Sequence, residues 1–203
     1  MKKNAFRYLA LSILTATFSI VATAQQDFIL DKENSELTVS GTSNLHDWEM
    51  VAETFSGETS ITMNEGNITE ISSVYFTCAV ADILSDKRIM NNKAHDALKE
   101  KKHPEIKFQM NRGNAAKLAD GKIDLTGTLT IAGKSKTVNV TSDYQLDSGN
   151  KLSVMGEATL KMTDFGIEPP TAMFGAVETD DKVTVKYSFK FNKSRDELSA
   201  KNK

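Results

Sequence analysis

The sequence is poor in residues that enzymes and metal proteins commonly use for their chemistry. Among its 203 residues it has one cysteine and three histidines. Cys78 has no second cysteine with which to form an internal disulfide. It lies in the apolar run 74–80, and no histidine or cation that would lower the pKa of the thiol stands near it in sequence. We therefore expect Cys78 to be buried and unreactive.

The three histidines form no recognisable site in the sequence. His46, His95 and His103 lack the close spacing of zinc ligands, and the lysines near the last two predict that both are solvated. The chain also has no G-x-S-x-G nucleophile elbow. Gly127 and Gly133 are separated by five residues, where a phosphate-binding loop needs four, and no helix follows them. The sequence thus predicts no catalytic residue, no metal and no cofactor.

The N-terminal region is the one place with a long uncharged apolar run. Lys2, Lys3 and Arg7 precede this run, which covers residues 8–21 and ends at Ala22-Thr23-Ala24. The pattern is typical of a signal peptide (residues 1–24) that is cut after Ala24. The run is shorter than the roughly 20 apolar residues that a membrane anchor needs. We expect a periplasmic or secreted protein with no integral membrane segment after cleavage.

Positive charge is scarce in the mature chain. Removing residues 1–24 takes away three positive charges and no acid, which lowers the formal net charge from −2 to −5. Nucleic acids and anionic membrane surfaces are bound through basic patches, so this charge argues against both as partners. The remaining length is typical of one domain, which we expect over residues 25–192. A disordered polar tail is expected over 193–203.

What the sequence has in abundance is alternation of apolar and polar residues. From Val183 to Phe191 every odd position is apolar, and residues 122–131 repeat the pattern. Shorter segments with the same period, separated by turn sequences, lie at 37–39, 106–110, 138–140 and 152–154. A period of two is typical of strands with one face toward water. Long strands joined by short turns predict an all-β fold, and favour a closed antiparallel barrel because closure removes exposed edges.

Two segments depart from this alternation. Residues 87–101 have apolar residues at helical spacing and predict one α-helix with Ser85 or Asp86 as its N-cap. This helix would lie against the barrel or close one end. Residues 164–181 form a long connection that carries several large apolar side chains. These side chains either pack on the barrel rim or line and cover an apolar opening.

Several stretches of the sequence together resemble one family. They are Phe28-Ile29-Leu30-Asp31 with Asn34-Ser35-Glu36-Leu37, the segment 99–108 around His103-Pro104-Glu105, Leu125-Thr126-Gly127-Thr128-Leu129, and Asp164-Phe165-Gly166-Ile167. Their order resembles that of the YceI-like polyisoprenoid-binding family over residues 27–191. The resemblance implies an extended eight-stranded, lipocalin-like barrel with one packed helix. It further implies an exported protein that holds a long isoprenoid, such as a quinone tail or a polyprenyl lipid, in its lumen.

An eight-stranded barrel either fills its interior with side chains or holds one slim ligand. The residues that we expect to contact such a ligand, from the lumen or from the late connection, are Val39, Trp48, Phe76, Phe108, Leu125, Leu129, Phe165, Ile167, Met173, Phe174, Tyr187 and Phe189. For Trp48, the only tryptophan, a core aromatic that anchors the early hairpin is the favoured interpretation, and ligand contact in the lumen is the alternative.

Three functional hypotheses follow from the sequence. The leading one is a binding protein for an apolar small molecule or lipid, a monomer or homodimer that acts as carrier, store or scavenger. The alternative is a structural or interaction barrel with a filled core and an external protein partner. An enzyme that acts on a lipid inside the barrel is the third. It predicts titratable side chains that meet in the lumen, with His46, Tyr75 and Tyr187 as the chief candidates.

Overall fold

Antiparallel strands make up most of the computed structural model, which describes residues 24–111, 113, 116–147, 149 and 151–194. The strands are β1 (Ala24–Leu30), β2 (Glu36–Ser43), β3 (Asp47–Ala52), β4 (Phe55–Asn64), β5 (Asn67–Ala79), β6 (Ile83–Leu84), β7 (Glu105–Met110), β8 (Lys117–Ala119), β9 (Lys122–Ile131), β10 (Lys134–Leu146), β11 (Leu152–Lys161), β12 (Thr171–Ala172) and β13 (Val177–Lys193). The helices between them are the α-helix α1 (Arg88–Ala97) and the 3-10 helices η1 (Lys32–Asn34), η2 (Val80–Asp82), η3 (Met162–Phe165) and η4 (Met173–Gly175). The predicted signal peptide lies outside the described residues up to residue 23.

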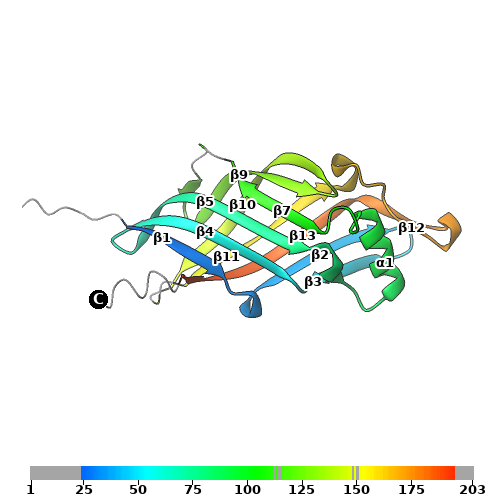
Figure 1. Cartoon of the computed structure of the whole chain (residues 1–203), viewed down its shortest axis with the longest axis horizontal. Coiled ribbons are helices and arrows are strands. Elements are labelled where there is room, and N and C mark those ends of the chain that lie inside the picture. The colour runs from blue at the N-terminus through cyan, green and yellow to red at the C-terminus, as the bar shows by residue number, and fades with distance from the viewer. Residues whose placement is uncertain (1–23, 112, 114–115, 148, 150, 195–203) are drawn as a thin grey trace, which may run out of the picture.

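The strands close into a barrel (Figure 1). Three pairs of strands each act as one long strand of the barrel. The first pair is β1 and β2, which η1 interrupts; the second is β3 and β4, and the third is β5 and β6. β13 completes the ring because it pairs with β2 over residues 179–188 and with β1 over residues 191–193. The predicted all-β, eight-stranded antiparallel barrel with one helix is therefore confirmed.

The barrel has two unlike ends (Figure 1). At one end, which we call the closed end, lie the β4–β5 turn, the start of β1 and the end of β13. At the other end, the mouth, lie α1, β12, η4 and the β2–β3 turn. The alternation of β13 follows the prediction, since its odd residues from Val183 to Phe191 face the lumen and Lys186 is exposed.

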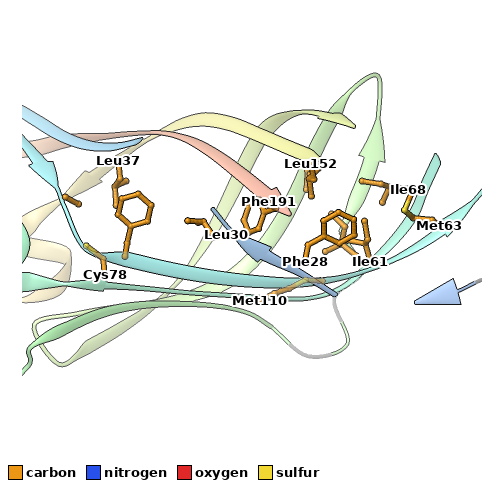
Figure 2. Packing of buried hydrophobic residues seen from close by; sticks show 14 of the residues in the cluster. Phe28, Leu30, Leu37, Ile61, Met63, Ile68, Cys78, Met110, Leu152 and Phe191 are labelled. Atoms are coloured by element: carbon orange, nitrogen blue, oxygen red, sulfur yellow. The ribbon is translucent and has the colours of Figure 1, made fainter. Parts of the chain in front are cut away.

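Large apolar side chains fill the barrel toward the closed end (Figure 2). Phe28 and Ile61 have no exposed surface, and Leu152 is 2% exposed. Phe191 and Met110 add side chains from two further strands to the same cluster. Burying each such side chain contributes about 1.5–3 kcal/mol. This packed half holds the strands together without help from a ligand.

Three glycines lie beneath large aromatic rings on the inner wall. The pairs are Gly41 with Trp48, Gly127 with Phe108 and Gly156 with Tyr187. A Cβ atom on Gly41 would lie 2.8 Å from Trp48 Cε2, and a Cβ atom on Gly156 would lie 2.7 Å from Tyr187 Cζ. The missing side chains let the rings lie close against the backbone of the wall.

Helix α1 is shorter than predicted. It ends at Ala97 instead of continuing to residue 101, because Lys99 has a φ of 58°, which is incompatible with a right-handed helix. The predicted N-cap is also wrong. The N-cap residue is Lys87, and no side chain caps the helix, whereas the Ser85 hydroxyl accepts a hydrogen bond from the Lys87 amide at 3.2 Å.

The last strand is longer than predicted at both ends. β13 begins at Val177, inside the predicted connection 164–181, and a register shift against β2 lies between Thr179 and Val183. Lys193 still belongs to β13, one residue beyond the predicted domain boundary. The rest of the predicted disordered tail lies outside the described residues from 195 onward.

The substitution Gly41→Ala tests the packing of ring against glycine. All three nearest atoms to the added Cβ belong to the Trp48 side chain, so we expect a loss of about 1–3 kcal/mol in the free energy of unfolding. Urea denaturation of Gly41→Ala, Trp48→Leu and the double variant will measure it. The second substitution should remove most of the cost of the first, and additive losses would contradict the proposed clash.

Candidate functional site

A cavity of about 1560 Å³ runs from the mouth into the barrel, and its lining reaches inward as far as Ile71, Ile123 and Leu152. This volume exceeds the roughly 300–1,000 Å³ of most small-molecule sites and would hold about 50 water molecules at ~30 Å³ each. The wall is mainly apolar. Residues such as Val39, Leu125 and Val154 point into the lumen and yet remain partly exposed, unlike the side chains of the closed end. The mouth half is therefore an unfilled apolar lumen.

The structure brings eleven of the twelve predicted ligand-contact residues to the wall of this cavity. They are Val39, Trp48, Phe76, Phe108, Leu125, Leu129, Phe165, Ile167, Met173, Tyr187 and Phe189. Trp48 combines both interpretations, since it packs against the core and lines the cavity, and its Nε1 donates to the Thr42 carbonyl at 3.2 Å.

The late connection divides into three parts. Phe165 and Ile167 are buried at the rim against Ile131 and Ala132, whereas Met173 is exposed at the opening of the cavity. Phe174 differs from the prediction, because it is fully exposed and does not line the cavity. Its backbone lies in the left-handed region, with a φ of 59°.

Sequence reasoning missed two parts of the cavity wall. One is the face of α1 with Met90 and Ala94, which packs against the core and lines the cavity together with Leu98. Its helical spacing was visible, but the pattern does not reveal which part of the barrel the helix covers. The other part is Val138 and Val140 of β10, which line the cavity. Their alternation predicted a strand with an apolar face, but they were not among the expected ligand contacts.

A row of aromatic rings forms the part of the wall next to the packed half. Phe189 stacks on Tyr187 with 5.1 Å between ring centroids and on Phe76 with 5.3 Å. Phe55 continues the row at 5.6 Å from Phe189. Such pairs contribute about 0.5–1.5 kcal/mol beyond the burial of their area. The row gives this part of the cavity wall an aromatic surface.

The barrel wall is open on one side, between β10 and β11. β10 pairs with β9 from Lys134 to Asp143, and β11 pairs with β13 along its whole length. β10 and β11 pair with each other only over 143–146 and 152–155. Beyond these pairs, residues 134–142 and 156–161 line two strand edges that do not pair with each other. We call this opening the seam.

The cavity reaches the surface through the seam. Asn139, Thr141 and Thr159 lie on the outer face by alternation, and they nevertheless line the cavity. The seam is bounded at its inner end by the 2.7 Å hydrogen bond between the hydroxyls of Ser142 and Tyr187. At the mouth it is bridged by the ion pair between Lys136 Nζ and Asp164 Oδ1, at 3.2 Å.

Comparison with known proteins places this geometry in a family. A family model, described as the YceI-like domain, matches residues 28–191. The chain belongs to the YceI-like domain family. No curated protein sequence matches the chain.

Solved structures share the fold of this YceI-like domain. BcnA from Burkholderia cenocepacia is 20% identical, with a TM-score of 0.63 over 79% of this chain and 98% of that chain. A polyisoprenoid binding domain from Saccharophagus degradans, implicated in plant cell wall breakdown, is 14% identical, with a TM-score of 0.62 over 82% and 98%. The YceI protein of Campylobacter jejuni is 20% identical, with a TM-score of 0.56 over 70% and 82%. Identities this low show the fold alone.

Two of the candidate titratable residues of this YceI-like domain, Tyr187 and His46, have different surroundings. Burial raises the pKa of the Tyr187 hydroxyl, and its bond with Ser142 lowers it to a smaller extent. His46 is exposed, and its Nδ1 lies 2.9 Å from the backbone oxygen of Asp47. In the part of the chain that the structure describes, no group of three His, Cys, Asp or Glu side chains is placed to hold a metal. None of the described helices is long and apolar enough to span a membrane.

The prediction that His95 and His103 are solvated is wrong. His95 is partly buried, and its Nε2 donates to the Ile83 carbonyl at 3.0 Å, which attaches α1 to β6. The ring of His103 packs over Gly133 in the β9–β10 turn. Both histidines therefore fix the helical segment to the mouth of the barrel.

Amide hydrogen exchange will test the seam. In residues 134–142, amides that point toward β9 are paired and those that point toward β11 are not, so we expect alternate amides to exchange at least about tenfold faster than their neighbours. Residues 183–188 of β13, which are paired on both edges, serve as the control. Uniform protection along β10 would contradict an open seam.

The reactivity of Cys78 will test its burial in the wall. Burial, and to a smaller extent the charge of Asp82, raises the pKa of the thiol from 9.0 to about 12. At pH 8 the thiolate fraction is then about 10⁻⁴, compared with about 10⁻¹ in the unfolded chain. We expect alkylation by iodoacetamide at pH 8 to be about a thousandfold slower in the folded protein than in urea. The folded rate should keep rising about tenfold per pH unit above pH 9, and similar rates at pH 8 would refute the burial.

Proposed function

We propose that this protein is an exported binding protein that holds a long apolar molecule, an isoprenoid or a similar lipid, in the mouth half of the barrel. It would act as carrier, store or scavenger. The observation that carries the proposal is the cavity of about 1560 Å³, whose apolar wall residues remain partly exposed inside the barrel. An apolar surface of this kind gains free energy when an apolar ligand replaces water.

The chemistry of the wall suits a hydrocarbon chain. Each buried CH₂ group contributes about 0.8 kcal/mol, so affinity grows with the length of chain inside the cavity. The aromatic row of Phe76, Tyr187 and Phe189 on the cavity wall offers apolar ring surface to such a chain. Charged side chains such as Lys136 and Asp164 lie at the mouth and seam. A polar head group would therefore stay at the opening while the chain enters the lumen.

Two further observations support the proposal. A structural relative from Saccharophagus degradans is a polyisoprenoid binding domain. The N-terminal pattern up to Ala24 is that of a signal peptide. Export would place the protein in the periplasm or outside the cell, where it can reach the lipids of a membrane surface. The alternative of a filled barrel with an external partner accounts for the packed closed end but not for the cavity.

Native mass spectrometry of the mature protein, purified from its own cells without detergent, is the direct test. We expect an adduct of one ligand per chain that organic extraction releases as a polyprenyl or quinone-type lipid. A bare protein that also fails to take up added isoprenoids would overturn the proposal.

Two substitutions at adjacent positions on β11 test whether the ligand binds in the lumen. Val154 lines the cavity, whereas Ser153 faces outward and accepts a hydrogen bond from Lys190 Nζ at 2.9 Å. Val154→Asp puts a carboxylate beside the ligand, which costs several kcal/mol if it stays unpaired, and should lower affinity at least about tenfold at pH 7. The loss should shrink at low pH, where the carboxylate is protonated.

Ser153→Asp is the matched control and should bind like the wild type. Circular dichroism must show that both variants are folded. Equal affinity of the two variants for an added isoprenoid would place the ligand outside the lumen and contradict the proposal.

A further inference from the structure

Four large apolar side chains are exposed around the mouth instead of packing inside it. Leu45, Ile89, Met173 and Phe174 are 66%, 74%, 72% and 112% exposed, the highest values for large apolar residues in the described part of the chain. They come from three separate segments, the β2–β3 turn, α1 and η4. We call these four residues the apolar rim.

The three segments meet at the same opening. Asn44, next to Leu45, donates through Nδ2 to the Ala176 carbonyl and accepts through Oδ1 from the Glu178 amide, both at 3.0 Å. These bonds attach the β2–β3 turn to the end of η4 and the start of β13. Three of the four rim residues also line the cavity at its opening, and Figure 1 shows α1 and β12 together at this end.

The backbone of η4 holds its two rim residues outward. Met173 and Phe174 have φ values of 51° and 59°, which residues with a side chain adopt only against a steric penalty. Such strain persists where the surrounding structure imposes it, and it is frequent at functional sites. Phe174 thus stays in solvent although an apolar cavity begins beside Met173.

Positive charge accompanies the rim. Lys87, Arg88 and Lys93 line the mouth, and within the described residues none of them forms an ion pair. The two carboxylates on the cavity lining, Glu157 and Asp164, are instead paired with lysines. Residues 85–103 carry six Lys or Arg and three Asp or Glu. The basic patch therefore belongs to the α1 side of the mouth, whereas residues 164–181, which also reach the mouth, carry five Asp or Glu and no Lys or Arg.

We infer that the apolar rim inserts into the surface of an anionic lipid bilayer, with Lys87, Arg88 and Lys93 on the lipid head groups. Exposed apolar side chains flanked by cations are the combination that binds such interfaces. A bilayer fits better than a protein partner because the rim surrounds an open apolar cavity, and docking brings that opening against acyl chains. The inference deepens the proposed function and rests on it for the identity of the transferred molecule, although docking itself requires no ligand.

Co-sedimentation of the mature chain with vesicles tests the inference, with phosphatidylcholine alone compared with phosphatidylcholine mixed with phosphatidylglycerol. We expect binding to the mixed vesicles and at least about tenfold weaker binding to the neutral ones. Ile89→Ser/Phe174→Ser should lose at least about tenfold in binding to the mixed vesicles. Ile29→Ser/Met155→Ser removes exposed apolar side chains away from the mouth and should bind like the wild type.

Arg88→Gln/Lys93→Gln should lose the preference for phosphatidylglycerol, and Lys117→Gln/Lys151→Gln should keep it. Wild-type binding by the rim variant, or no vesicle binding by the wild type, would overturn the inference. A stable complex of the rim with a defined protein in place of vesicle binding would also overturn it. Ligand content by native mass spectrometry keeps the two proposals apart, because an empty cavity with intact vesicle binding would count only against the proposed function.

Discussion

The closure of the ring by β13 is the constraint on which the rest of the structure depends. This strand pairs with β11 on one edge and with both β2 and β1 on the other, so the first and last parts of the chain are joined into one ring. Because side chains alternate along a strand, closure turns the apolar face of every strand toward one interior. The interior then has to be filled by side chains or by something else.

The chain uses both solutions. Toward the closed end, Phe28, Ile61 and Phe191 fill the lumen, and this packing stabilises the fold without a ligand. Toward the mouth, the glycines beneath Trp48, Phe108 and Tyr187 let large rings lie against the wall. Close packing thus dominates toward the closed end and open space toward the mouth, and the aromatic row around Phe189 lies along the wall between Tyr187 and Phe191.

The fold could be predicted from the sequence because its main signal is local. The period of two in residues 183–191 fixes which side chains of β13 face inward, and closure preserves that choice. The end of α1 could not be predicted, since it depends on a left-handed Lys99. The position of Phe174 could not be predicted either, because the pattern of apolar residues in a loop carries no information on the backbone φ. The seam was equally hidden, because β10 alternates in the same way whether its second edge is paired or free.

The seam changes how a flexible chain can enter the barrel. An unbroken tube must be threaded end first, and the entropy lost in threading grows with the length of the chain. A tube that is slit along part of its length accepts a chain from the side, segment by segment. If a chain binds in the lumen, its rate of exchange would depend on the width of the slit and on the Lys136–Asp164 bridge across it more than on chain length. A molecule with a bulky group at each end would also be admitted by such a wall.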